Sequence, residues 1–413
     1  MTALTAVRVE SIAAGGDGVG RVAGDSGAPL VAFLPRTAPG DVGRARLAVK
    51  GRFARGEMIE LAEPSPLRVA PPCAHYTEDR CGGCQIQHLR YDAQLEAKQG
   101  IVVDSLVRIG KRSVERPAVE PSPRQWRYRR KLTLALRRRG DRWIAGLHPY
   151  DAPGRVFELR DCPITDERVV AAWRRVMAAQ ELLPHARELR GAVRLLGDGV
   201  SFVLEGGEKW PGAHAFFDAV PECEALWWER DGGRRRLLHE RRPDGAPGAS
   251  FTQVNREVSD ALWTFVERRV EARRPAVLVD AYSGAGDSAV RIASRGVRVT
   301  AIEADAEAAR WCASRLPRGS RSLAARVEDA LEDALPADLV IVNPPRTGLH
   351  ERVPVVLERA APPAIIYVSC SPPTLARDLA RLPRYRVAGL RCFDMFPQTA
   401  HVETVCELER EAA

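Results

Sequence analysis

One cysteine lies where an apolar run ends, and its position could serve nucleophilic chemistry. Residues 364–368, Ala-Ile-Ile-Tyr-Val, predict a buried strand, and Pro372 and Pro373 prevent that strand from continuing far beyond Cys370. A thiol presented at the end of a strand can attack an electrophilic carbon. Free cysteine is also among the most frequently buried residues. Cys370 on its own therefore leaves catalysis and core packing both open.

A second candidate site is a glycine-containing loop that follows an earlier apolar run. Residues 277–282 lead into Ser-Gly-Ala-Gly at 283–286, and a further run ends at Glu303, 23 residues beyond Asp280. A loop of this kind lets a ligand approach the backbone, and an acid at the end of the second strand can bind a ribose diol. Nicotinamide dinucleotides and S-adenosylmethionine share this arrangement. A dinucleotide site would have a third glycine near Ala289, although alanine is an accepted variant there.

The end of another apolar run favours the second of these cofactors. Residues 339–342 are followed by Asn343-Pro344-Pro345-Arg346. Asn-Pro-Pro after an apolar strand is typical of methyltransferases that act on a planar nitrogenous substrate or a base. The two prolines stiffen the loop against which the target ring and the methyl donor would pack.

Composition and charge describe a globular chain with a basic segment. The chain has 413 residues and a net charge of +8, and we expect two or three domains. We see no apolar run long enough to span a membrane and no secretory signal, and we therefore expect a cytoplasmic protein. Residues 124–142 hold nine basic residues and one acidic residue, with Trp126 and Tyr128 interleaved. This pattern fits a nucleic-acid surface, or equally the solvated face of a strand pair.

The order of strand-like and helical runs predicts the fold class. Residues 6–62 contain about five short strands separated by glycine turns, which predicts a small OB-like barrel. Strand-rich pieces, with a helix near 165–182, fill the middle of the chain. From about residue 250, strands alternate with helices and predict an α/β domain with a mostly parallel sheet. We expect three domains: a barrel at 1–66, a β-rich central domain at 67–249 and a Rossmann-like domain at 250–413.

Taken together, the ordered motifs resemble the RNA uracil-C5 methyltransferase family, which makes 5-methyluridine. The resemblance covers nearly the whole chain, with a TRAM domain at the amino end and a class I S-adenosylmethionine-dependent methyltransferase domain at the carboxyl end. The matching motifs are Phe-Thr-Gln-Val-Asn at 251–255, DAYSGAGD at 280–287, NPPR at 343–346, SCSP at 369–372 and DMFPQTAHVET at 394–404.

The resemblance implies two catalytic residues. Carbon C5 of uracil is a poor nucleophile until a thiolate adds to C6, and Cys370 would be that thiolate. After methyl transfer a carboxylate must remove the C5 proton, and Glu403 would do so, with His401 as a possible helper. The resemblance also implies S-adenosylmethionine contacts at Gln253, Tyr282, Glu303, Asn343, Asp287 and Asp329. The family often has aspartate where this chain has Asn343, and asparagine keeps the carbonyl acceptor but loses the charge.

Four further cysteines have spacings that suit a metal centre. Cys73, Cys81 and Cys84 lie close together, and Cys162 follows much later, directly before a proline. Three close thiols and one remote thiol suit tetrahedral ligation, but spacing alone does not separate zinc from iron–sulfur. The resemblance implies a [4Fe-4S] cluster, although the gap between Cys73 and Cys81 is longer than the family's.

The expected partner is RNA with an accessible loop uridine, because extruding a base costs least where it is already unpaired. We favour large-subunit ribosomal RNA and keep transfer RNA as the alternative, and we expect a monomer that does not bind membranes. Two rivals remain. A DNA cytosine-C5 methyltransferase would carry its nucleophile after the strand that here ends in Asn-Pro-Pro-Arg. A catalytically silent RNA-binding protein would have no need of both Cys370 and Glu403.

Overall fold

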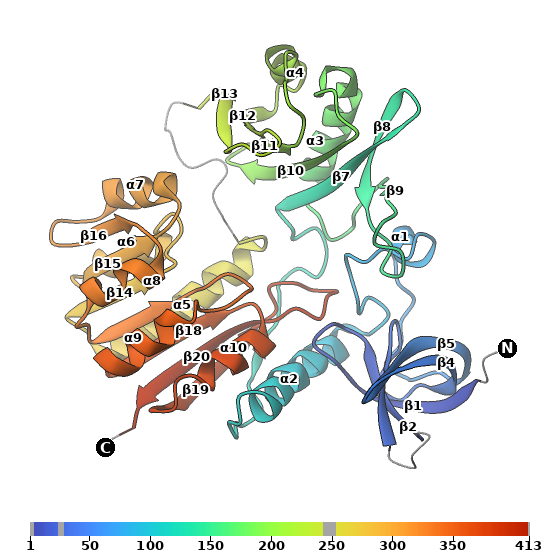
Figure 1. The fold of residues 1–413 in the computed structure, drawn as a ribbon, viewed down its shortest axis with the longest axis horizontal. Coiled ribbons are helices and arrows are strands. Elements are labelled where there is room, and N and C mark those ends of the chain that lie inside the picture. The colour runs from blue at the N-terminus through green and yellow to red at the C-terminus, as the bar shows by residue number, and fades with distance from the viewer. Residues whose placement is uncertain (1–3, 24–28, 243–252, 412–413) are drawn as a thin grey trace. The chain divides into compact units, whose positions relative to one another are not determined.

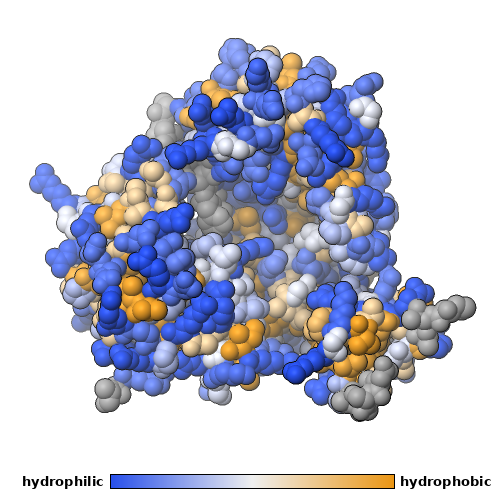
Figure 2. Space-filling model, viewed as in Figure 1, coloured by the Kyte–Doolittle hydropathy of each residue, from blue (hydrophilic) through white to orange (hydrophobic). Residues whose placement is uncertain are grey.

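The computed structural model describes residues 4–23, 29–242 and 253–411 and divides the chain into two compact units (Figure 1). The first unit contains Met1–Ala70, Gln85–Pro123 and Glu257–Ala413, and the second contains Pro71–Cys84 and Arg124–Arg256. The segment expected to form a central domain, 67–249, is thus shared between the units, and its expected end at 249 lies outside the described residues. The face of each unit seen in Figure 2 is predominantly hydrophilic. Among the described residues, no helix is both long and apolar enough to cross a membrane.

The amino end of the first unit is a closed five-stranded barrel, as the glycine-punctuated strands predict. Its strands, in the order in which they pair, are β1 (Thr5–Ile12), β2 (Gly18–Ala23), β3 (Pro29–Leu34), β5 (Phe53–Glu63) and β4 (Val42–Lys50). Small aliphatic side chains such as Val9, Ala32 and Ala45 fill its centre. Gly56 lets β4 and β5 pass closely, because a Cβ there would lie 1.9 Å from the carbonyl oxygen of Arg46.

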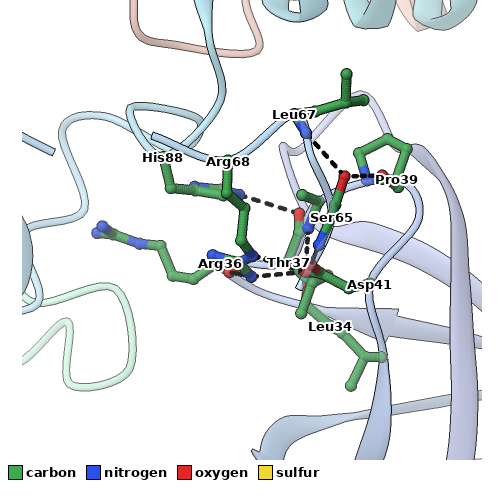
Figure 3. A network of polar contacts seen from close by, with 10 residues as sticks. Leu34, Arg36, Thr37, Pro39, Asp41, Ser65, Leu67, Arg68 and His88 are labelled. Atoms are coloured by element: carbon green, nitrogen blue, oxygen red, sulfur yellow. Dashed lines mark hydrogen bonds and ion pairs between the residues drawn. The ribbon is translucent and has the colours of Figure 1, made fainter. Parts of the chain in front are cut away.

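A buried polar network joins this barrel to the segment that leaves it (Figure 3). The Asp41 carboxylate is fully buried and accepts hydrogen bonds from the backbone amides of Ala38 (2.7 Å) and Ser65 (2.9 Å) and from the Arg68 guanidinium (2.6–3.1 Å). Burial opposes ionisation of Asp41, but the bonds from Arg68 and the backbone hold its pKa below the ordinary value. Burial lowers the pKa of His88 to about 4, so this ring is neutral where it contacts the Thr37 carbonyl. The network fixes residues 65–68 against the barrel.

The rest of the first unit is an eight-stranded sheet covered on both faces. The strands, in the order in which they pair, are β16 (Arg321–Ala324), β15 (Arg298–Glu303), β14 (Val277–Ala281), β17 (Leu339–Val342), β18 (Ala364–Ser369), β20 (Glu403–Arg410), β19 (Tyr385–Phe393) and β6 (Val119–Glu120). The first five are parallel, and β20 is antiparallel to β18 and to β19. This is the predicted α/β fold.

The strands of this sheet are apolar on both sides because a separate core covers each face. In β14, Val279 packs into one core and Leu278 into the other. The first core includes residues of α2 (Tyr91–Arg108), α8 (Val327–Ala330), α9 (Arg352–Ala360) and α10 (Pro372–Leu379), and the second includes residues of α5 (Arg256–Arg273), α6 (Asp287–Ala293) and α7 (Ala306–Arg315). Parallel strands buried on both faces read as near-continuous apolar runs, which is the pattern seen in the sequence.

The second unit is the predicted β-rich region, and it contains a seven-stranded sheet. The strands, in the order in which they pair, are β13 (Arg236–Glu240), β12 (Cys223–Glu229), β11 (Gly199–Glu205), β10 (Glu188–Leu196), β7 (Lys131–Arg139), β8 (Arg142–Leu147) and β9 (Phe157–Glu158). Its helical elements are α1 (Ala74–Thr77), α3 (Glu167–Ala178), α4 (Ala213–Ala219) and the 3-10 turn η1 (Gln180–Leu182). Helix α3 and the turn after it account for the helix expected near 165–182.

Helix α2 fixes the loop that leads into β20. The Lys98 ammonium is fully buried, contacts the Asp394 carboxylate and donates to the Phe396 carbonyl oxygen at 3.0 Å. The Tyr91 hydroxyl donates to the other Asp394 oxygen at 2.8 Å. Gln94 and Gln398 exchange two hydrogen bonds, one between their side-chain amides (3.0 Å) and one from the Gln398 backbone amide (2.9 Å). This part of the DMFPQTAHVET motif is therefore held by side chains of α2.

Replacing Lys98 with methionine is expected to destabilise the first unit by about 3–5 kcal/mol, because the Asp394 carboxylate would remain buried without its cation. The matched control is Arg90→Ala, which removes an ion pair to Asp92 whose two side chains are about half exposed. That change is expected to cost no more than about 1 kcal/mol. Thermal unfolding followed by circular dichroism measures both. A Lys98→Met protein as stable as Arg90→Ala would contradict the anchoring role of the buried pair.

Candidate active site

The structure brings Cys370 and Glu403 together. The last paired residues of β18 and β20 are Ser369 and Thr404, so Cys370 follows one partner and Glu403 precedes the other. Burial raises the pKa of the Cys370 thiol, and the nearby Glu403 carboxylate raises it further. Glu403 is itself 2% exposed, whereas Cys370 is half-buried. A thiol and a carboxylate thus share one edge of the sheet.

Arg346 is a third member of this site and was not assigned a role from the sequence. Its guanidinium lies close enough to the Cys370 sulfur to lower the pKa of the thiol by charge and by a hydrogen bond, opposing the effect of Glu403. Arg346 is the last residue of the Asn-Pro-Pro-Arg motif and follows β17, the neighbour of β18. A cation directly after the proline pair, next to a strand that presents a cysteine, was the available signal.

The loop after β14 has the backbone shape that its glycines suggested. Tyr282 has φ of +63°, which is unusual for a residue with a side chain, and Gly284 has φ of +57°. The Glu303 carboxylate accepts hydrogen bonds from the backbone amides of Gly284 and Asp305, both at 2.8 Å. Gly286 permits close packing on α7, because a Cβ there would lie 2.1 Å from the Cys312 sulfur. The acid at the end of β15 is thereby fixed beside the glycine loop.

A second acid, Asp280, is the fourth residue of β14 and precedes this loop. It is the only charged residue in β14, it is fully buried, and it accepts a 2.7 Å hydrogen bond from the Ser288 hydroxyl. Burial, and to a lesser degree the Glu303 charge, raise the pKa of Asp280 to about 6. Burial also raises the pKa of Tyr282, two residues further along the chain, to about 12. An acid within an apolar strand was the sequence signal for Asp280.

The other residues expected to contact the cofactor lie in different settings. Asn343 follows β17 and is half-buried, and its backbone amide donates to the Ala281 carbonyl at 3.2 Å. The remaining acids, Asp287 and Asp329, are exposed and form ion pairs with Arg315 (2.9 Å) and Arg352 (3.3 Å), respectively.

Topology gathers most of these residues on one edge. Five of the residues lie at the carboxyl edge of the parallel sheet. Tyr282, Asn343 and Cys370 directly follow β14, β17 and β18, Glu303 ends β15, and Glu403 is the first residue of antiparallel β20. Open α/β sheets bind ligands at this edge. Gln253 belongs to the second unit, where it is half-buried. Phe251 and Thr252 of the first motif lie outside the described residues.

The four predicted metal ligands are only partly gathered. Cys73 and Cys84 are buried in one small cluster, and Cys162 packs against it. Cys81 is buried outside that cluster, and its sulfur accepts a hydrogen bond from the Gly83 amide at 3.4 Å. All four are outside disulfide bonds. Among the described residues, no three histidine, cysteine or acidic side chains are arranged as a metal-binding group. The described residues thus bring three of the four predicted ligands into one cluster.

The same cluster corrects the interpretation of Tyr128. Tyr128 is 1% exposed and packs with Cys73 and Cys84, and the half-buried Trp126 packs against the same cluster. Tyr128 therefore belongs to the interior of the second unit and does not form a base-stacking face. Several basic side chains of residues 124–142 also have partners within the unit, among them Arg127 with Asp161 (2.8 Å).

The proximity of Cys370 and Glu403 predicts how the thiol reacts with iodoacetamide. Because thiolate is the reactive form, alkylation of native Cys370 should become half-maximal at a pH above the ordinary range for cysteine. Glu403→Gln removes a negative charge and should shift this midpoint to lower pH, whereas Arg346→Ala should shift it higher. Asp329→Asn is the control and should leave the midpoint unchanged. Mass spectrometry of the peptide that contains Cys370 measures the rate, and equal midpoints in all four proteins would disprove the proximity.

Comparisons with known proteins find relatives that match nearly the whole chain. A family model described as tRNA (Uracil-5-)-methyltransferase matches residues 317–411. An RNA methyltransferase of Gloeobacter violaceus is 34% identical, and the alignment covers 98% of this chain and 96% of the relative. The 23S rRNA (uracil(1939)-C(5))-methyltransferase RlmD of Dichelobacter nodosus is 30% identical over 99% of this chain and 100% of the relative.

The fold has a solved counterpart of full length. The crystal structure of Pyrococcus abyssi tRNA (uracil-54, C5)-methyltransferase in complex with S-adenosyl-L-homocysteine matches with a TM-score of 0.66. At 24% identity, the alignment covers 97% of this chain and 99% of that chain, so the likeness concerns the fold. Together with the relatives above, which span nearly the whole chain, it leads to one conclusion: the protein belongs to the family of S-adenosylmethionine-dependent RNA (uracil-C5) methyltransferases.

Proposed function

We propose that this enzyme methylates C5 of a uridine in large-subunit ribosomal RNA, using Cys370 as nucleophile and Glu403 as base. The observation that carries the proposal is the shared position of these two side chains, whose charges influence each other across the β18–β20 pair. The ribosomal substrate is supported by the full-length similarity to the 23S rRNA enzyme of D. nodosus. An RNA substrate of this kind places the work of the enzyme in the cytoplasm.

The residues of the site can divide the reaction between them. The Cys370 thiolate adds to C6 of the uracil ring, and the electron pair of the C5–C6 double bond moves toward the O4 carbonyl as an enolate. S-adenosylmethionine, when bound, supplies the methyl group that C5 attacks. C5 then carries both a methyl group and a proton. The Glu403 carboxylate accepts that proton, the double bond re-forms, and the Cys370–C6 bond breaks to release thiolate.

The opposing effects on the pKa of the Cys370 thiol indicate a role for Arg346. Burial and the Glu403 charge both favour the neutral thiol, which is the unreactive form. Arg346 opposes both effects and would stabilise the thiolate before addition and after release. Glu403 must stay ionised to accept a proton, and its negative charge therefore opposes the charge on the attacking sulfur. We propose that Arg346 resolves this conflict by donating to the sulfur.

The cofactor would lie along the same edge of the sheet. The Glu303 carboxylate, fixed by two backbone amides, suits a ribose diol, and Tyr282 and Asn343 flank the place where the methyl donor must meet the target ring. We propose Gln253 as a further contact on the family resemblance alone. Asp287 and Asp329 are weaker candidates, because both are exposed and engaged by arginines.

The two catalytic roles can be tested by separate variants. With tritiated S-adenosylmethionine and ribosomal RNA stripped of the modification, Cys370→Ala should incorporate no label. Glu403→Gln should still allow methyl transfer to C5 but block proton removal. The protein should then remain covalently attached to the RNA and migrate slowly in a denaturing gel. Cys406→Ala, at a fully buried cysteine of β20, is the control and should keep full labelling. Undiminished label with Cys370→Ala would exclude the mechanism.

Transfer RNA is the second candidate substrate. It is supported by the description of the matching family model and by the fold shared with the P. abyssi enzyme. Parallel labelling reactions with unmodified large-subunit RNA and unmodified transfer RNA separate the two substrates. Label confined to transfer RNA would overturn the ribosomal assignment while leaving the chemistry intact.

We further propose that Cys73, Cys81, Cys84 and Cys162 hold a metal centre, with a [4Fe-4S] cluster as the first choice and zinc as the alternative. The support is the burial of Cys73, Cys81 and Cys84, none of them in a disulfide, and the packing of Cys162 against the cluster of Cys73 and Cys84. Ligation would require Cys81 to join that cluster. The centre would have a structural role, because it ties residues 73–84 to residue 162 within one unit.

Protein purified without oxygen should then contain about four iron and four sulfide per chain, or one zinc. Cys84→Ser should lose the metal and unfold at a lower temperature than the native protein, since metal-binding energy contributes to folding. Cys223→Ser, at a buried cysteine of the same unit outside the set, should keep the metal. Native protein free of both metals would rule out the centre.

A further inference from the structure

The second unit contains a pocket that neither the mechanism nor the comparisons account for. It has a volume of about 450 Å³, within the range of small-molecule sites. The lining residues are Glu208, Lys209, Trp210, Pro211, Trp228, Arg230, Arg234 and Arg236. Four cations, one carboxylate and two indole rings thus surround one cavity.

The pocket has a fixed frame. Its two walls, residues 206–211 and residues 228–236, are joined by hydrogen bonds that include Gly206 amide to Glu229 carbonyl (2.9 Å), Gly207 amide to Asp231 carboxylate (3.1 Å) and Asp231 amide to Gly207 carbonyl (3.2 Å). The two glycines have positive φ angles, +106° and +78°, a conformation that favours glycine.

The aromatic rings are held by their own polar groups. The indole N–H of Trp228 donates to the Gly206 carbonyl (2.9 Å) and that of Trp210 to the Leu182 carbonyl (2.7 Å). The two rings lie nearly edge to face, with centroids 6.4 Å apart. The indole orientations are therefore set before any ligand arrives.

The four cationic side chains that line the pocket are available to bind a ligand. Among the described residues, the side chains of Lys209, Arg230, Arg234 and Arg236 form no ion pair or hydrogen bond. Arg235, between two of them in the sequence, behaves differently and pairs with Glu229 (3.2 Å) and Glu205 (3.6 Å). Residues 234 and 236 thus line the pocket, whereas residue 235 between them is paired with acids. Arg236 also lies directly opposite Trp228 in the β12–β13 pair.

We infer that this pocket binds one unstacked nucleotide of the RNA substrate, outside the catalytic site. Guanidinium groups form paired hydrogen bonds with phosphate oxygens, and indole faces stack on unpaired bases without regard to sequence. Trp210 is 7% exposed and packs against Phe216, so Trp228, which is half-buried, is the indole that a base can reach. An acidic peptide would satisfy the arginines but would offer no ring to stack on Trp228. The pocket would anchor a second nucleotide of the same RNA while the target uridine reacts at residues of the first unit. The inference rests on the proposed RNA substrate but not on the roles of Cys370 and Glu403.

The test is fluorescence anisotropy with a labelled, unstructured RNA of twelve nucleotides. The double variant Arg234→Ala/Arg236→Ala should bind about tenfold more weakly at 0.1 M salt. Loss of two phosphate contacts should make the logarithmic salt dependence shallower by about 1.4. Arg235→Ala is the matched control, removing one positive charge next to the pocket, and should bind like the native protein. Trp228→Leu should weaken binding with an unchanged salt dependence, because it removes stacking and no charge.

Four results would overturn the inference. The double variant could bind RNA as tightly as the native protein, or Arg235→Ala could weaken binding as much as the double variant. Polyglutamate could displace the RNA at equal charge concentration, which would indicate an acidic polypeptide. Uridine monophosphate could displace it at micromolar concentration, which would indicate a free nucleotide. If binding falls as expected while methylation by the native protein fails its own test, the pocket stands and the proposed function falls.

Discussion

The register between β18 and β20 is the constraint on which the candidate active site depends. Six residue pairs join the strands, from Ala364 with Glu409 to Ser369 with Thr404, and they leave Cys370 and Glu403 next to each other at the end of the ladder. Because side chains alternate between the faces of a sheet, a slip of one residue would turn Glu403 to the opposite face. Glu403 is also paired with Phe393 of β19, so its position is set from both sides.

This register is supported by contacts that are remote in the sequence. The chain enters β20 through residues 394–400, and these are held by Lys98, Tyr91 and Gln94 of α2. A buried ion pair of this kind gains little net stability, but losing one partner is costly, so it strongly disfavours other arrangements of the loop. We interpret the pair as a device that fixes where β20 begins. The thiol directly follows β18 and the carboxylate is the first residue of β20, so both are positioned by paired strands.

The fold and the edge of the sheet could be predicted from the sequence because local patterns determine them. Apolar runs broken by glycine and proline predicted the barrel strands, and the alternation of strands and helices predicted the parallel sheet. The positions at which those strands end predicted Cys370 and Glu303 as site residues. Contacts between distant segments could not be predicted. The pairing of Lys98 with Asp394 joins residues 296 positions apart, and nothing local in either segment indicates it. The prediction that Tyr128 stacks on bases was wrong for a related reason. An aromatic residue among arginines has the same local sequence pattern whether its ring faces bases or packs into a cysteine cluster.

The central claim is that a bond between Cys370 and uracil C6 makes C5 nucleophilic, which obliges C5 to lose its original hydrogen. The most direct measurement uses RNA in which the uridines carry tritium at C5, with unlabelled S-adenosylmethionine. We expect one tritium to appear in water for each methyl group transferred, and none to appear with Cys370→Ser. Methyl transfer that leaves the tritium in the RNA would place the new carbon on another atom of the ring and contradict the account.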